Sequence, residues 1–179
     1  FFLRVHHLDY AEFTGDEGFT YVFTRDSISE MAAKTVALIE PHPLGSYVIQ
    51  KAWAEAAGTN AFGFRYSSVY FGMLGCALMW PLAKRLRLDV AGRLLPLACV
   101  GFLAANAYAV YYSREVRMYA MLVAFSLLST YLMLRLLKAP NKLLWLGYVL
   151  AAACGLYMHY YAALALVAQN LFALGHLLS

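Results

Sequence analysis

The chain has 179 residues, of which 63% are hydrophobic and 13% are charged, and its formal net charge at pH 7 is +4. Soluble domains carry about 45–50% apolar and about 25% charged residues, so this composition excludes an ordinary soluble domain and favours a protein embedded in lipid. The basic residues stand in short clusters between apolar runs, which is typical of membrane topology signals and excludes a nucleic-acid-binding stripe.

The first 61 residues predict a loop outside the membrane that carries helices of its own. Ser27-Ile28-Ser29-Glu30 is a capping box that begins a helix reaching to about Leu38. A second helix follows Pro43 and ends at Gly58. Amphipathic helices of this kind lie in the membrane interface. Because the chain begins without methionine and ends directly after an apolar run, we expect it to be part of a longer protein.

Residues 62–179 predict one membrane domain of about four to five spans. A span needs about 20 mostly apolar residues, and the uncharged runs 66–83, 94–112 and 118–134 fit this requirement. The last run, 143–179, is too long for one crossing at about 1.5 Å per residue, so it predicts two helices that turn at His159. The predicted fold is all-α: a polytopic transmembrane helical bundle with interfacial amphipathic helices in the first outer loop.

Two short loops between the spans set the predicted orientation. They contain half of the 14 lysines and arginines: Lys84, Arg85, Arg87 and Arg93 in one, and Arg135, Lys138 and Lys142 in the other. Alternating crossings place both loops on one side, which the positive-inside rule assigns to the cytoplasm. The connectors at 4–61, 111–119 and 157–161 then face outward.

The first candidate groups lie in the predicted outer loop. Asp16 and Glu17 are adjacent carboxylates, so one can act as a general base while the other orients a partner or a metal; the alternative is a solvated acidic turn that caps a helix. His42 lies between Pro41 and Pro43, which fix its backbone near the start of a helix. It can bind a phosphate or a metal there, or it is an exposed loop histidine.

The connector at 111–119 holds Arg114, Glu115 and Arg117 between two apolar runs. On a helix, the two arginines share a face and can grip one phosphate with their planar guanidinium groups. The alternative is an interfacial arginine–glutamate pair within an aromatic belt.

Two further ionisable residues stand at the ends of predicted spans. Arg65 opens the first complete span, either as another phosphate ligand or as an interface residue that snorkels toward the headgroups. His159 lies close to the interface at membrane depth, where ionisable groups are functional candidates; otherwise it is a hydrogen-bonded turn histidine.

The order of these motifs resembles the C-type glycosyltransferases. Asp-Glu in the first outer loop is followed by His-Pro, an arginine at the next span, Tyr-Ser-Arg-Glu-Val-Arg-Met-Tyr and Tyr-Met-His-Tyr. This order is most similar to the dolichyl-phosphate-mannose–protein mannosyltransferase and aminoarabinose transferase group, from about Leu8 to Leu178. The chain departs from that group at Leu44, where the group often has a second proline, and at Arg114, where it often has glutamine.

The resemblance implies an inverting transferase that moves a sugar from a polyprenyl-phosphate donor to an acceptor at the outer face of the plasma membrane. It implies Asp16 as the base, with Glu17 beside it. The donor phosphate would bind the arginines Arg65, Arg114 and Arg117, and the cavity would be lined by His42, Glu115, Tyr119, His159 and Tyr160. The resemblance requires no cofactor, although some relatives hold a divalent metal near the acidic pair.

Two other classes of protein fit parts of the pattern. A transporter or flippase for a lipid-linked or anionic solute also needs outward arginines and membrane histidines, but its binding groups usually lie near the bilayer midplane. The span centres at 72–77 and 120–129 carry no charge, which favours the enzyme. In a structural or sensor subunit, Asp16 and Glu17 would only cap a helix.

Overall fold

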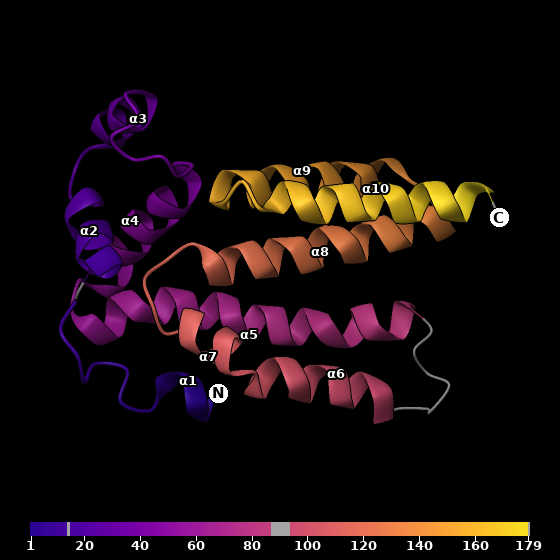
Figure 1. Ribbon diagram of the computed structural model, residues 1–179, viewed down its shortest axis with the longest axis horizontal. Coiled ribbons are helices and arrows are strands. Elements are labelled where there is room, and N and C mark those ends of the chain that lie inside the picture. The colour runs from indigo at the N-terminus through magenta and orange to yellow at the C-terminus, as the bar shows by residue number, and fades with distance from the viewer. Residues whose placement is uncertain (14, 87–93, 179) are drawn as a thin grey trace.

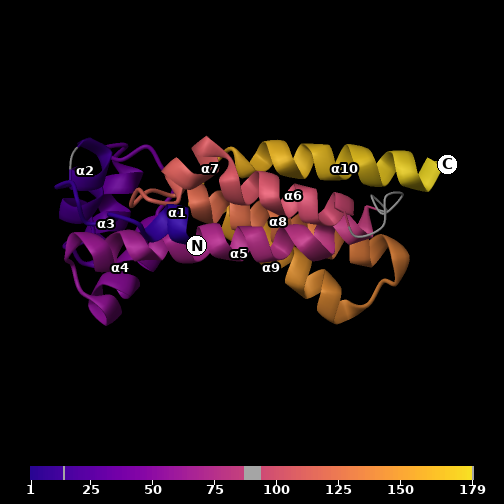
Figure 2. The same ribbon diagram turned by 90° about the horizontal axis from the view of Figure 1, so that it is seen from below.

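The computed structural model describes residues 1–13, 15–86 and 94–178, and these residues form ten helices and no strand. Long helices pack side by side into a bundle, and the short helices α1–α4 gather at one end of it, far from the C-terminus (Figures 1 and 2). The all-α prediction is confirmed for this part of the chain.

The outer segment contains four short helices: α1 (Phe2–Val5), α2 (Gly15–Phe23), α3 (Ile28–Val36) and α4 (Gly45–Ala57). The predicted capping box at α3 is confirmed, because the Ser27 side chain accepts a hydrogen bond from the Glu30 backbone and the Glu30 carboxylate accepts one from the Ser27 backbone. Helix α4 is capped by Gly58 as predicted, and the positive φ of Gly58, 85°, suits a residue without a side chain.

The long helices follow the predicted apolar runs, with one break. They are α5 (Ala61–Arg85), α6 (Leu94–Ala105), α7 (Ala107–Tyr112), α8 (Tyr119–Lys138), α9 (Lys142–Met158) and α10 (Ala162–Leu178). The turn predicted at His159 is confirmed, since it separates α9 from α10. The run 94–112 is divided at Asn106, whose side chain accepts a hydrogen bond from Ala109 N at 3.0 Å and caps α7.

Among the described residues, α8 is the one helix whose length and hydropathy both suffice for a membrane span. Helices α6, α9 and α10 are apolar but shorter. The predicted number of four to five spans therefore stays a prediction. Apolar residues of α9 and α10 are nevertheless more than half exposed: Leu146, Val149, Leu150, Leu164, Val167 and Leu171.

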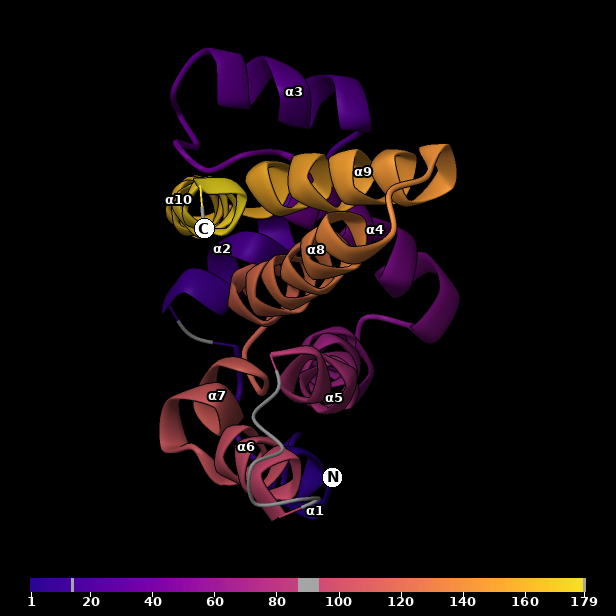
Figure 3. The same ribbon diagram turned by 90° about the vertical axis from the view of Figure 1, so that its right-hand side faces the viewer.

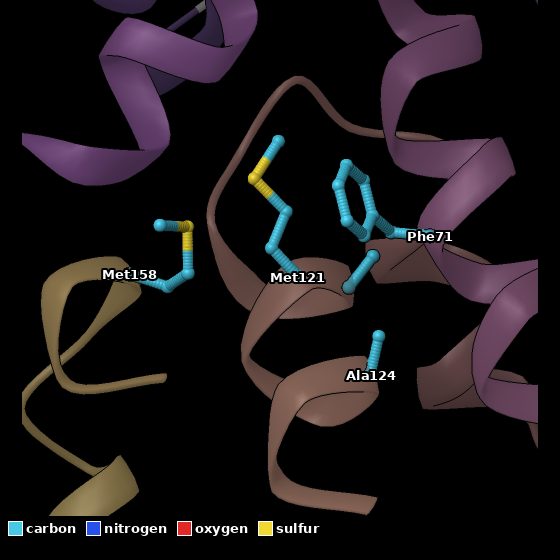
Figure 4. Close-up of a cluster of buried hydrophobic side chains, with 5 residues drawn as sticks. Phe71, Met121, Ala124 and Met158 are labelled. Atoms are coloured by element: carbon cyan, nitrogen blue, oxygen red, sulfur yellow. The ribbon is translucent and has the colours of Figure 1, made fainter. Parts of the chain in front are cut away.

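A buried apolar cluster joins α5, α8 and the end of α9 directly beneath the outer segment. Phe71, Met121, Ala124 and Met158 pack together there (Figure 4), and Ile49 of α4 packs against them. This contact fixes the outer segment on the bundle. The residues on either side of the cluster are therefore held in a defined position relative to one another.

A second, polar cluster joins α8, α9 and α10 within the bundle. The Gln169 amide donates to Ser129 Oγ and Thr130 Oγ1, both at 2.9 Å, and its oxygen accepts from the Tyr148 hydroxyl at 3.2 Å. Hydrogen bonds between side chains of neighbouring apolar helices stabilise their association. Because these groups satisfy one another, the cluster is a structural contact.

The two ends of the bundle differ in the residues that they carry. The turns at 113–118 and 159–161 lie at the end where α2–α4 pack, whereas α5 and α8 end together at the opposite pole (Figure 1). Lys84, Arg85 and Lys138 therefore stand at one pole, as predicted. Arg87 and Arg93 of the same predicted loop lie outside the described residues.

Candidate active site

Glu17 lies in a buried ion pair that ties together three segments of the chain. Its carboxylate accepts hydrogen bonds from Arg65 Nε at 2.9 Å and from Arg65 Nη2 at 2.6 Å. The backbone N–H of Val116 donates to the same carboxylate at 3.0 Å. Glu17 thus connects α2, α5 and the 113–118 connector, and its oxygens are committed to these contacts.

The other N–H groups of Arg65 bind the outer segment as well. Nη1 donates to the carbonyls of Leu8 and Ala11, at 2.9 and 2.8 Å, and Nη2 donates to the carbonyl of Glu12 at 3.3 Å. All five donors of the guanidinium group therefore have partners. This corrects the expectation that Arg65 binds a donor phosphate, because it has no free donor; here Arg65 holds the outer segment and Glu17 in place.

Asp16 and Arg117 meet at the surface of the same region. Arg117 Nη2 lies 3.4 Å from Asp16 Oδ2, and the two side chains are 6% and 76% exposed, respectively. Arg117 Nη1 donates to Thr20 Oγ1 at 3.4 Å, while its Nε has no partner among the described residues. An exposed carboxylate thus lies over a buried cation that retains free hydrogen-bond donors.

The 113–118 connector is not helical, so Arg114 and Arg117 do not share a helix face. Arg114 instead donates to the carbonyls of Leu3 and His7, both at 3.1 Å. The expectation that both arginines grip one phosphate is therefore corrected, because the turn sends them to different neighbours. Glu115 lies half-buried between them, and its carbonyl accepts a hydrogen bond from Arg117 N at 2.8 Å.

His42 and His159 face each other near Arg117, with ring centroids 5.4 Å apart. His42 is held by Glu40, whose carboxylate pairs with His42 Nδ1 and accepts from His42 N at 3.0 Å. His159 Nδ1 accepts a hydrogen bond from Tyr161 N at 3.1 Å, so the neutral ring carries its proton on Nε2. Burial, followed by the charges of His42 and Arg117, lowers the pKa of His159.

Tyrosines complete the surroundings of His159. The rings of Tyr119 and Tyr160 lie 5.9 and 6.5 Å from the His159 ring, between centroids. Both residues were expected to line the site, and the structure brings them to this histidine. Aromatic rings thus surround His159 on the side of Tyr119 and Tyr160.

Tyr47 of α4 is a member of this region that the sequence does not reveal. Its side chain is buried, and its hydroxyl lies beside Glu40 and Arg117. Burial and the negative charge of Glu40 raise the pKa of Tyr47, and the nearby charge of Arg117 opposes this. Tyr47 therefore interacts with both Glu40 and Arg117, and its hydroxyl stays neutral.

The acidic pair does not fit a divalent-metal site. Glu17 is committed to Arg65 and Val116, so Asp16 is the one carboxylate of the pair that remains accessible. In the part of the chain that the structure describes, no group of three or more His, Cys, Asp or Glu side chains could hold a metal ion. We therefore derive no step through a metal.

A family model described as dolichyl-phosphate-mannose-protein mannosyltransferase matches residues 41–178 of the chain. The matched range contains His42, Arg117 and His159, and it begins after Asp16 and Glu17. The chain matches no curated protein and no solved structure.

Proposed function

Because the chain belongs to the dolichyl-phosphate-mannose-protein mannosyltransferase family, we propose that it moves a sugar from a polyprenyl-phosphate donor to an acceptor at the outer face of the plasma membrane. Membership makes the protein a membrane glycosyltransferase that uses a lipid-linked sugar. The polyprenyl carrier, the face of the membrane, the inversion and the roles of individual residues are our inference.

The contact between Asp16 and Arg117 is the observation that supports this proposal most directly. Transfer from a phosphate carrier produces an anionic leaving group and requires removal of a proton from the acceptor hydroxyl. A buried guanidinium group with free donors can stabilise the anionic leaving group, and an exposed carboxylate can accept the proton of the acceptor hydroxyl. The sequence separates these two residues by about 100 positions, and the fold brings them to 3.4 Å.

The proposed reaction uses these two groups on opposite sides of the sugar. The acceptor oxygen attacks the anomeric carbon while Asp16 takes the acceptor proton. The bond from that carbon to the phosphate oxygen breaks, its electron pair leaves with the phosphate, and Arg117 stabilises the resulting charge. Because the attack comes from the face opposite the phosphate, the anomeric configuration inverts. The sugar must enter between the two groups, so their contact opens when the donor binds; Asp16 can move because it is exposed.

The histidine pair and Tyr47 would surround the bound sugar and orient it. His159 is neutral and His42 is held by Glu40, so both rings present fixed edges to a ligand. The Tyr47 hydroxyl lies buried beside Glu40 and Arg117.

The test is transfer of radiolabelled sugar from polyprenyl-phosphate donors by membranes that contain Asp16→Asn. We expect turnover to fall at least about hundredfold, which is the contribution of a general base, with membrane insertion unchanged. Asp26→Asn is the matched control, since Asp26 lies in the same outer segment and pairs with Lys34 at 2.5 Å. Turnover retained by Asp16→Asn would remove Asp16 from the proposed role.

A further inference from the structure

A cavity of about 940 Å³ lies at the pole of the bundle opposite the candidate active site. It is bounded by the ends of α5 and α8 and by the last turns of α10, which lie at the pole that faces the viewer in Figure 3. None of its lining residues belongs to the site described above. It therefore requires an explanation of its own.

Three cations line this cavity. Lys84 and Arg85 stand in the last turn of α5, and Lys138 stands at the end of α8. None of them pairs with a carboxylate of the described residues, and none of the described residues that line the cavity is acidic. The carbonyl ends of α5 and α8 attract these cations, but each helix end contributes only about half a negative charge. The cluster therefore remains positive.

The remaining wall of the cavity is mostly apolar. Leu134 and Leu137 of α8 and Phe172 of α10 line it. Because α8 is long and apolar enough to span a membrane, this wall runs from the level of the three cations toward the interior of the bilayer. A ligand that fits the whole cavity must combine an anionic group with an apolar chain.

We propose that this cavity binds an anionic phospholipid from the surrounding leaflet. Its phosphate would lie among Lys84, Arg85 and Lys138, and an acyl chain would lie along Leu134, Leu137 and Phe172. Basic pockets between membrane helices recognise lipid headgroups through this combination of charge and depth. The volume is that of a site for a whole ligand and not for one ion. The proposal concerns the pole remote from Asp16, so it does not depend on the proposed transferase mechanism.

The same observations favour a lipid over free phosphate. A free anion could neutralise the three cations but would leave the leucine and phenylalanine wall in contact with water. A phospholipid covers both surfaces at once, and burial of its chain adds about 0.8 kcal/mol for each buried methylene group. The leaflet on the side of the basic loops is also the one that is rich in anionic lipids.

The test uses the purified protein in nanodiscs of equimolar phosphatidylcholine and phosphatidylglycerol, with native mass spectrometry of the lipids that stay bound. We expect retention of phosphatidylglycerol in preference to phosphatidylcholine. Each substitution among Lys84→Gln, Arg85→Gln and Lys138→Gln should lower that preference about fivefold, the effect of one basic residue near an anionic lipid. Added inorganic phosphate should not displace the lipid.

A matched variant separates this site from general electrostatics. Arg25→Gln, Lys34→Gln and Lys51→Gln together remove the same charge from the outer segment, and we expect this variant to retain phosphatidylglycerol as the unmodified protein does. Leu134→Trp narrows the apolar wall without changing charge, and it should lower retention. The proposal is overturned if phosphatidylglycerol is not preferred, if the outer-segment triple variant loses it as much as the Lys84, Arg85 or Lys138 variants do, or if inorganic phosphate displaces it.

Discussion

The charged residues that characterise the two poles of the bundle are in opposite physical states. At the outer pole, Glu17 and Arg65 are buried and bound to each other, and the buried Arg117 donates to the Thr20 hydroxyl and pairs with Asp16. At the other pole, Lys84 and Lys138 are exposed and have no carboxylate partner in the described chain. Buried charges must be paired and therefore fix geometry, whereas exposed charges adapt to what surrounds them. The first state suits a catalytic site, and the second suits membrane orientation and lipid binding.

Breaking the buried ion pair should have the largest effect on stability. Glu17→Gln leaves the Arg65 guanidinium group buried without its counter-charge, which costs about 3–5 kcal/mol. The measurement is the free energy of unfolding in a denaturing-detergent titration. Glu55→Gln is the control, because the Lys51–Glu55 pair at 3.4 Å is exposed on the Glu55 side and contributes at most about 1 kcal/mol. Equal losses in both variants would contradict the distinction between buried and exposed pairs.

The second prediction addresses Arg117, a buried arginine at the outer pole that keeps a free donor on Nε. Arg117→Lys keeps the charge but loses the planar guanidinium group, so affinity for the polyprenyl-phosphate donor should fall about tenfold. The measurement is the KM for the donor in the radiolabel transfer assay. Arg114→Lys is the control, since Arg114 binds the carbonyls of Leu3 and His7. If both variants bind the donor normally, Arg117 does not bind its phosphate.

The third prediction uses the lowered pKa of His159. A lowered pKa means that the folded protein favours the neutral ring, so the associated stability is present above the ordinary histidine pKa of about 6.5 and is lost as the pH falls below it. Protonation also removes the acceptor for Tyr161 N. Melting temperatures measured between neutral and mildly acidic pH should fall less steeply for His159→Gln than for the unmodified protein.

His6→Gln is the control for that measurement, because His6 is exposed. It should keep the slope of the unmodified protein. An unchanged slope in His159→Gln would show that His159 does not titrate in the folded protein over this pH range.

The smallest effect is expected at the basic pole. Lys84 is exposed, and its ammonium group lies 4.8 Å from the centroid of the Trp80 ring. Lys84→Gln should therefore change the free energy of unfolding by no more than about 0.5 kcal/mol in phosphatidylcholine nanodiscs, as is usual for surface substitutions. A loss as large as that of Glu17→Gln would mean that the charges at the two poles are not in different states.

Features set by local chemistry could be predicted from the sequence. The capping box at Ser27 and the stop at Gly58 depend on residues within one turn of the helix end, and both are confirmed. The turn at His159 follows from the length of an apolar run against the thickness of a bilayer. Helix α2 was not predicted, because Gly15 and Gly18 weaken the helix signal around the acidic pair.

Features set by distant contacts could not be predicted in this way. Arg65 and Glu17 are 48 positions apart. Their sequence patterns predict two separate functional groups, whereas in the fold the two residues are paired with each other. The spacing of Arg114 and Arg117 suggested a common face only if the connector were helical. Tyr47 lacked any signal, since its place depends on Arg117 and Glu40 together. The sequence pattern around Arg4 also gives no indication of its role, although Arg4 is buried and donates to the carbonyls of Leu103 and Ala104.

The hydrogen bond from Val116 to Glu17 has a consequence for the order in which the protein assembles during synthesis. The two residues are 99 positions apart, so Glu17 leaves the ribosome long before Val116 has been synthesised. Until α6 and α7 have been made, the Glu17 carboxylate lacks this partner. Arg117 emerges with Val116, so the acidic and basic halves of the site come together at the same late step. A nascent chain interrupted before that step would expose an incompletely folded outer segment to proteases and chaperones.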